Sequence, residues 1–171
     1  MRHRLALLCL FPFFIVLAAC RPEANTEPVA PKSIEHRFTL QIGEQPIQVQ
    51  VAVTAGEQRR GLMFRESLNE HEGMIFIYPT PQPLRFWMLN VPIHLDIGFF
   101  DSEGVLLEVH RMVAHDTTGV ASQSREVRYA LEMKAGWFAA NGIRPGVRLD
   151  LALLRTAVRE RGFNPDIYID R

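Results

Sequence analysis

The chain has 171 residues, 47% of them hydrophobic and 22% charged, and its 19 Lys and Arg balance 19 Asp and Glu. This composition is typical of a globular domain and excludes a disordered, collagen-like or disulfide-rich small protein. A formal charge of zero also excludes a general nucleic-acid binder, because such a protein needs a surplus of basic residues on one face.

Residues 1–19 have the pattern of a secretory signal peptide. Arg2 and Arg4 precede the mainly apolar residues 5–17, a run too short to cross the ~30 Å hydrocarbon core of a membrane as a helix. Small residues then lead to Cys20. This arrangement resembles the lipobox of bacterial lipoproteins, in which the cysteine thiol is acylated and the chain is cut ahead of it. The alternative is an ordinary signal peptide that ends beside a cysteine.

Lipidation of Cys20 would anchor the mature protein in a membrane of the cell envelope. Cleavage leaves Cys20 as the only cysteine, so we expect no disulfide within the mature chain. Arg21 follows Cys20, whereas Gram-negative lipoproteins that stay in the inner membrane carry Asp at that place. The resemblance therefore favours the outer membrane, with the domain facing the periplasm. Residues 20–35 contain three prolines and few large apolar side chains, which predicts a flexible, lipid-attached tether.

Residues 36–155 are predicted to form one β-rich domain, because their apolar residues mostly alternate. Residues 38–42 and 47–53 are expected to form a hairpin. Thr54 and Glu57 fit a capping box, which predicts a short helix that ends near Leu62. Further strands are predicted at residues 73–78, 84–90, 93–100, 105–112, 129–133 and 147–154.

The predicted fold class is mainly β within α+β. Seven or eight short strands in about 120 residues, with one or two short helices, favour a compact antiparallel β-barrel-like sheet or a strongly bent sheet. Residues 156–171 are predicted to be a C-terminal tail that either docks on the domain or hangs loose.

Four separated motifs resemble the bacterial and archaeal domain of unknown function 192. They are RRGLMFRESL, EGMIFIY, FWMLNVPIHLDIGFFDSEG and YALEMKAGWFAANGI, in order over roughly residues 45–153. The resemblance implies a compact β-rich domain without a settled molecular function. Its recurrent elements fall on Arg60, Gly61, Leu62, Met63, Trp87, Met88, Asn90, Leu95 and Asp96.

Asp96 is a carboxylate within a strongly apolar predicted strand. An isolated buried carboxylate is unfavourable, so we expect Asp96 to be paired, protonated or exposed in a cleft. Arg60, Arg65 and Asn90 are its candidate partners. Asp96 then either forms a structural ion pair or has a ligand-binding or catalytic role.

A ligand-binding site is predicted from Arg60, Arg65, Trp87, Asn90 and Asp96. Trp87 lies in an aromatic cluster that could floor a binding groove, although core packing is the commoner role of such a cluster. Such a site requires Arg60, Trp87, Asn90 and Asp96 to open onto one concavity.

The sequence leaves two functional hypotheses. The first is a non-enzymatic, lipid-anchored envelope domain that binds a small polar ligand, an envelope component or a protein partner, with no cofactor and no nucleic acid. The alternative is a hydrolase of envelope glycans or peptides, in which Asp96 and either His94 or Glu132 converge as acid and base. No close-spaced pattern of Met or His indicates a metal site, and no metal is expected.

Overall fold

The structure, a computed structural model, describes residues 30–170. The predicted signal peptide, Cys20 and the first part of the predicted tether lie outside the described residues. In chain order the elements are β1 (Phe38–Ile42), β2 (Gln45–Ala52), α1 (Ala55–Arg60), β3 (Glu72–Gln82), β4 (Arg85–Phe86), β5 (Leu95–Phe100), β6 (Leu106–Met112), β7 (Val120–Ala121), β8 (Val127–Lys134), α2 (Trp137–Ala140), α3 (Leu151–Glu160) and η1 (Pro165–Ile167). Among residues 30–170, no helix has both the length and the hydropathy needed to cross a membrane.

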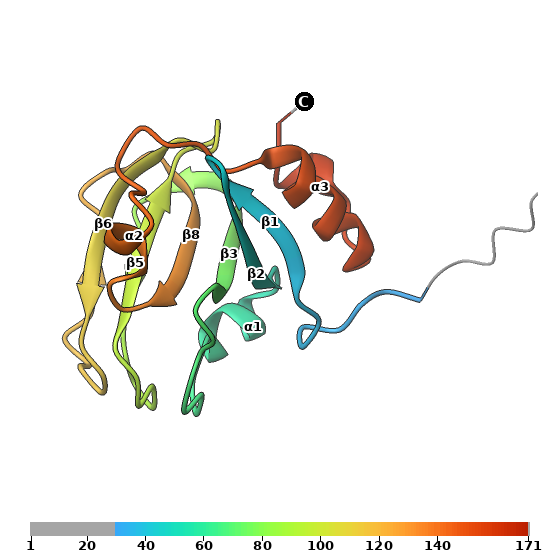
Figure 1. Cartoon of the computed structure of the whole chain (residues 1–171). Coiled ribbons are helices and arrows are strands. Elements are labelled where there is room, and N and C mark those ends of the chain that lie inside the picture. Colours follow the sequence, from blue (N-terminus) through green and yellow to red (C-terminus); the bar gives the residue numbers. More distant parts are fainter. Residues whose placement is uncertain (1–29, 171) are drawn as a thin grey trace, which may run out of the picture.

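Six strands form one mixed sheet in the order β1-β2-β3-β8-β5-β6 (Figure 1). Neighbouring strands are antiparallel except β2 and β3, which run parallel. A parallel pair needs a crossover connection, and α1 with the loop after it supplies that crossover. The predicted class, mainly β within α+β, is confirmed. The expectation of a wholly antiparallel sheet is wrong at this one pair.

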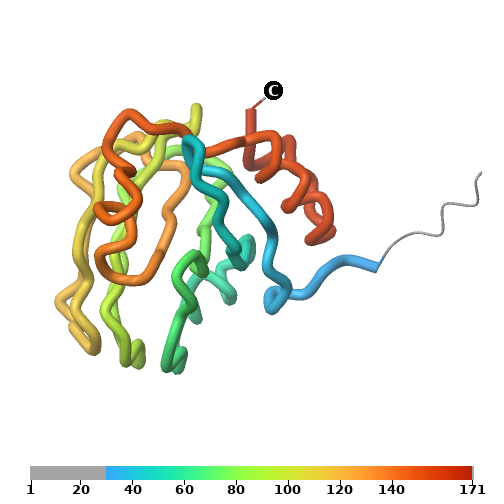
Figure 2. Tube along the Cα trace, in the orientation of Figure 1, coloured from blue at the N-terminus to red at the C-terminus, as the bar shows by residue number. Residues whose placement is uncertain are grey.

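The sheet is open, with β1 and β6 at its edges. Two isolated bridges tie the segment before α3 to both edges of the sheet. Ile42 at the end of β1 pairs with Leu149, and Val105, directly before β6, pairs with Arg148. Figure 2 shows the orange-red stretch that contains α2 packed beside the strands. No ladder joins β1 to β6 among the described residues, so the barrel-like alternative is wrong.

The two faces of the sheet carry separate apolar layers, because successive side chains of a strand point to opposite faces. One layer packs the sheet against α2, α3 and the C-terminal residues, and includes Ile75, Ile77, Leu131, Met133, Phe138 and Leu154. The other packs it against the segment after α1 and the segments on either side of β4, and includes Leu62, Met74, Phe76, Leu84, Met88, Ile97 and Phe99. The crossover and the loop after β4 therefore cover the second face.

The local predictions at the N-terminal end of the domain are confirmed. The hairpin pairs Phe38 with Val49 and Ile42 with Gln45. The capping box of α1 is complete, because Thr54 Oγ1 accepts from Glu57 N and the Glu57 carboxylate accepts from Thr54 N. Both features depend on residues close together in the chain, which is why the sequence pattern reveals them.

Two predicted strands need correction. The strand predicted at residues 147–154 is wrong, because Asp150 caps a helix there by accepting hydrogen bonds from Ala152 N and Leu153 N. The strand predicted at 84–90 shrinks to β4, which pairs with the unpredicted β7. Its second half turns away from extended structure, with Asn90 at a φ of 57°.

The C-terminal tail docks on the domain. Arg128 Nη1 lies 2.6 Å from Asp170 Oδ2, and the Tyr129 hydroxyl donates to the carbonyl oxygen of Tyr168 at 3.1 Å. Arg128 is 4% exposed. These contacts fix the last residues beside the start of β8, so the loose alternative is wrong for the described part of the tail.

Candidate functional site

Glu132 is a buried carboxylate in the middle of the sheet. β8 is a central strand, and Glu132 lies opposite Met74 of β3 and Ile97 of β5. The side chain faces the layer covered by the crossover, since Leu131 and Met133 belong to the layer on the other face. Glu132 is 4% exposed, and its Oε2 is buried without a hydrogen-bond partner among the described residues.

Burial raises the pKa of Glu132 from its ordinary value of 4.5 to about 8, because the apolar surroundings disfavour the ionised form. At pH 7 the group is therefore mainly a neutral acid that can donate a hydrogen bond. Burial and the nearby Glu132 carboxyl also raise the pKa of Tyr78 to about 12. Glu132 and Tyr78 are thus two protonated groups on adjacent strands of the same face.

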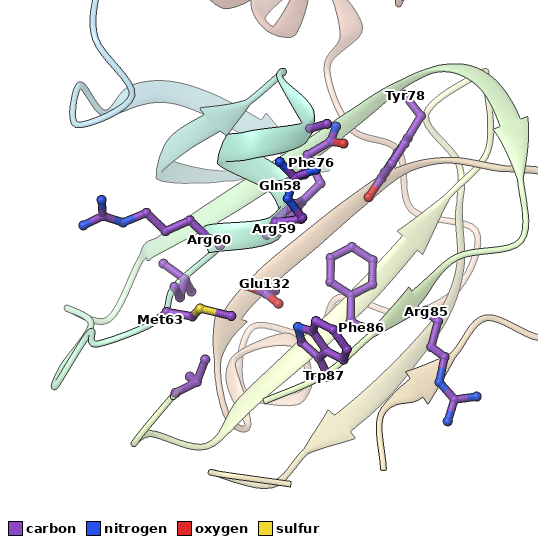
Figure 3. A pocket seen from close by; sticks show the side chains of 14 residues that line it. Gln58, Arg59, Arg60, Met63, Phe76, Tyr78, Arg85, Phe86, Trp87 and Glu132 are labelled. Carbon is purple, nitrogen blue, oxygen red and sulfur yellow. The ribbon is translucent and has the colours of Figure 1, made fainter. Parts of the chain in front are cut away.

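A cleft of about 270 Å³ opens above Glu132. The last residues of α1 and the turn after it form one wall, and β4 with Trp87 forms the other (Figure 3). Phe76 and Phe86 meet edge to face inside the cleft, with ring centroids 4.9 Å apart. Trp87 is 55% exposed, which places it at the mouth. In Figure 3 Glu132 and the hydroxyl of Tyr78 point into the space between these walls.

Three arginines surround the mouth of the cleft. Arg59 and Arg60 come from the last turn of α1, and Arg85 comes from β4. Arg85 donates to the carbonyl oxygen of Thr118, whereas Arg59 and Arg60 form no ion pair with any residue in the range 30–170. In Figure 3 the guanidinium groups of Arg60 and Arg85 lie at the rim, away from Glu132. The mouth is therefore cationic and the floor neutral.

The structure brings only part of the predicted ligand-binding set together. Arg60 and Trp87 line the cleft. Arg65 lies in a neighbouring polar pocket, where its Nη2 donates to Gln50 Oε1 at 2.9 Å. Asn90 does not line the cleft; its carbonyl oxygen accepts from Phe64 N at 2.7 Å and joins two loops.

Asp96 has the contacts of a structural ion pair. It is 5% exposed and accepts from Arg111 Nε at 2.5 Å and from Gly136 N at 2.7 Å. Arg111 is its direct neighbour in the pairing of β5 with β6, and Gly136 is the residue before α2. None of the expected partners, Arg60, Arg65 and Asn90, bonds to it, so Asp96 fixes the start of α2 to the sheet.

The acid and base of the hydrolase alternative do not converge. Asp96 pairs with Met133, and Glu132 with Ile97, so the two carboxyl groups lie on opposite faces of the sheet. His94 Nδ1 accepts from Ala114 N at 3.0 Å, and His94 does not line the cleft. Arg60, Trp87, Asn90 and Asp96 therefore do not share one concavity.

A signal for Glu132 was present in the sequence. It interrupts an apolar strand in the same way as Asp96 does, but the face on which it points and the segments above that face depend on contacts between distant residues. Tyr78 carries no comparable local signal, whereas the pair Arg59 and Arg60 at the end of the predicted helix already indicates a grip for a carboxylate or phosphate. Among residues 30–170, no group of three or more His, Cys, Asp or Glu side chains is arranged to hold a metal ion.

Comparisons with known proteins give related sequences and folds. The DUF192 family model, described as "Uncharacterized ACR", matches residues 38–151. A solved protein of unknown function from Novosphingobium aromaticivorans DSM 12444 is 30% identical, with a TM-score of 0.64 over 67% of this chain and 84% of that chain. A protein from Sinorhizobium meliloti 1021, provisionally designated a transcription regulator, is 30% identical, with a TM-score of 0.62 over 67% of this chain and 91% of that chain. No curated protein matches the sequence.

Proposed function

We propose a function for this chain from its own site, because the chain belongs to the DUF192 family and that family is uncharacterised. The protein is a non-enzymatic binding module whose cleft above Glu132 holds a small organic ligand. The observation that carries this proposal is the buried Oε2 of Glu132, which has no hydrogen-bond partner among the described residues. Leaving a buried polar group unpaired costs about 1–3 kcal/mol, and a bound ligand would supply the missing partner.

Binding fits the cleft better than hydrolysis does. The cleft lining contains one carboxyl group, Glu132, and no histidine. Acid–base hydrolysis of a glycoside needs a second carboxylate within several Å, and Asp96 lies on the opposite face of the sheet. A single neutral acid surrounded by aromatic side chains is suited to orienting a ligand by a hydrogen bond.

The ligand screen that tests this proposal compares the wild-type protein with Glu132→Met by thermal unfolding. The panel contains small aromatic and sugar-ring acids, amines and amides. We expect at least one compound to raise the Tm of the wild type by about 5 °C near saturation, because ligand at 100 times its Kd stabilises a folded protein by about 2.7 kcal/mol. The same compound should leave the Tm of Glu132→Met nearly unchanged.

The matched control is Glu126→Met, which removes an exposed carboxylate on the segment before β8. This control should respond to the compound as the wild type does. Equal shifts in wild type and Glu132→Met would place the binding elsewhere, and a panel without any shift would contradict the proposal.

We also propose that the module works at the cell envelope, exported by residues 1–19 and anchored through a lipid on Cys20, with the outer membrane favoured by Arg21. The full chain has equal numbers of acidic and basic residues, which argues against a nucleic-acid partner. The designation of the Sinorhizobium meliloti protein is therefore not carried over to this chain.

Metabolic labelling with palmitate tests the anchor. Wild-type protein expressed in a Gram-negative host should take up label and sediment with membranes, because acyl chains on Cys20 partition into lipid. Cys20→Ser should take up none. The control Cys9→Ser should be labelled as the wild type is, as long as it is exported. Label that persists in Cys20→Ser would contradict the lipoprotein proposal.

A further inference from the structure

We infer that the ligand of the Glu132 cleft is a small aromatic anion, with its ring between Phe86, Trp87 and the α1 wall and its negative charge at Arg59 and Arg60. This inference rests on the proposed binding function and adds the chemical class of the ligand. It is carried by the charge distribution of the cleft, the donors at its floor and the side chains of its walls.

The charge at the mouth has one sign. Arg59, Arg60 and Arg85 line the cleft, and Glu132 is its one acidic lining residue. The neighbouring arginines already have acidic partners. Arg65 lies 3.8 Å from Glu35, and Arg161 pairs with Glu57 of α1. Arg59 and Arg60 therefore remain available, and a guanidinium group binds carboxylate or phosphate oxygens through paired hydrogen bonds.

The floor of the cleft offers donors to the ligand. A pKa raised by burial keeps Glu132 in its neutral form at pH 7, and Tyr78 keeps its hydroxyl proton. Both groups can donate to an oxygen or ring nitrogen of a ligand. A cationic ligand would have to ionise Glu132 and also pass three arginines at the mouth, which is unfavourable on both counts.

The walls fit a flat ring. Phe86 packs edge to face on Phe76 and tilts toward Phe99, with ring centroids 5.9 Å apart, so its ring is fixed in place. Trp87 leaves much of its indole exposed at the mouth. Met63 faces these rings across the cleft (Figure 3), and a thioether adapts to aromatic surfaces. An aromatic ligand would cover apolar surface that the protein itself leaves open.

The test uses matched pairs of probes that share a ring and differ in charge: indole-3-acetate with tryptamine, and phenylacetate with phenethylamine. Affinities are measured by calorimetry at pH 7 for four proteins: wild type, Arg59→Gln/Arg60→Gln, Glu132→Gln and the control Arg144→Gln, which removes an exposed arginine outside the cleft. We expect the acids to bind at least tenfold more tightly than the amines.

The variants separate the parts of the inference. The double arginine variant should weaken binding of the acid at least tenfold, while Arg144→Gln should leave it within about twofold. Glu132→Gln removes the ionisable carboxyl group from the cleft floor, so it should abolish any binding of amines that depends on an ionised Glu132. Tighter binding of the amines, lost in Glu132→Gln, would overturn the inference and leave the binding function intact.

Two further outcomes are decisive. If neither acids nor amines bind while the thermal screen finds a neutral ligand, the inference about charge is wrong and the proposed function stands. If neither these probes nor any compound of the screen binds, the proposed function and the inference are both wrong.

Discussion

Replacing Glu132 by glutamine is expected to flatten the fall in folding stability that the wild-type protein shows as pH rises from 5 to 8. In the unfolded chain Glu132 ionises near 4.5, whereas burial raises the pKa of the folded protein's Glu132 to about 8. Between these values the folded state holds a proton that the unfolded state has released. The free energy of unfolding then falls by about 1.4 kcal/mol per pH unit.

The sign of this contribution is set by the raised pKa. Below pH 4.5 Glu132 is protonated in both states, so its contribution to stability is fully present. It is lost as pH rises and is gone above about 8, a total of up to about 5 kcal/mol. Carboxylates with lowered pKa values act in the opposite direction and at lower pH, as for Glu57, where hydrogen bonds from Thr54, Val53 and Arg161 outweigh the effect of burial.

Urea unfolding at pH 5, 6, 7 and 8 measures the effect. Glutamine cannot ionise, so Glu132→Gln should lose the slope that wild type and the exposed-site control Glu126→Gln retain. All other ionisable groups are common to wild type and Glu132→Gln and cancel in the difference between these two proteins. Parallel curves for wild type and Glu132→Gln would mean that Glu132 is paired or solvated in the folded protein, and the neutral floor of the cleft would be wrong.

The same physics predicts how ligand binding and stability oppose each other at this position. Glu132→Met should be more stable than wild type at pH 8, because a side chain of similar length without a charge replaces an unpaired buried acid. A stabilising substitution that also removes ligand binding is the behaviour of a residue kept for its function.

Short-range patterns made the first third of the domain predictable. The hairpin and α1 follow from alternation and from the capping pair Thr54 and Glu57, which are three residues apart. The parallel pairing of β2 with β3 joins strands whose order depends on packing across the whole sheet, and nothing local indicates it. Residues 147–154 also alternate as a strand would, although Asp150 starts a helix there, and nothing local reveals the difference.

For the site, sequence reasoning identified the unusual residue types but not their partners. It singled out Asp96 as a carboxylate that needs compensation, and Arg111 provides it from the neighbouring strand across the β5–β6 turn. From the sequence Glu132 is only an acid–base alternative, because its lack of a hydrogen-bond partner depends on the residues of α1, β3 and β4 that surround it in the fold. Trp87 and Arg60 do line the cleft, on opposite walls.

Replacing Arg161 by methionine is expected to destabilise the protein by about 3–5 kcal/mol, since removing one member of a buried ion pair leaves the other charge uncompensated. The side chain of Arg161 is 5% exposed. Its Nε donates to the carbonyl oxygen of Val51 at 3.2 Å, its Nη1 donates to that of Lys32 at 2.7 Å, and its Nη2 pairs with Glu57. One guanidinium thus joins β2, the segment before β1 and α1.

The control for this prediction is Arg159→Met in the last turn of α3, two residues before Arg161. Its side chain is exposed and forms no ion pair with any other residue from 30 to 170. Urea unfolding at pH 7 should place Arg159→Met within about 0.5 kcal/mol of wild type and Arg161→Met far below both. Arg161→Lys should recover part of the loss, because an ammonium group keeps the charge but cannot reach three acceptors from one plane.

Because Glu57 also caps α1, amide hydrogen exchange of α1 should rise in Arg161→Met, and the cleft wall that carries Arg59 and Arg60 should loosen with it. Unfolding of Arg161→Met at the same urea concentration as Arg159→Met would show that Arg161 does not hold α1 to the sheet.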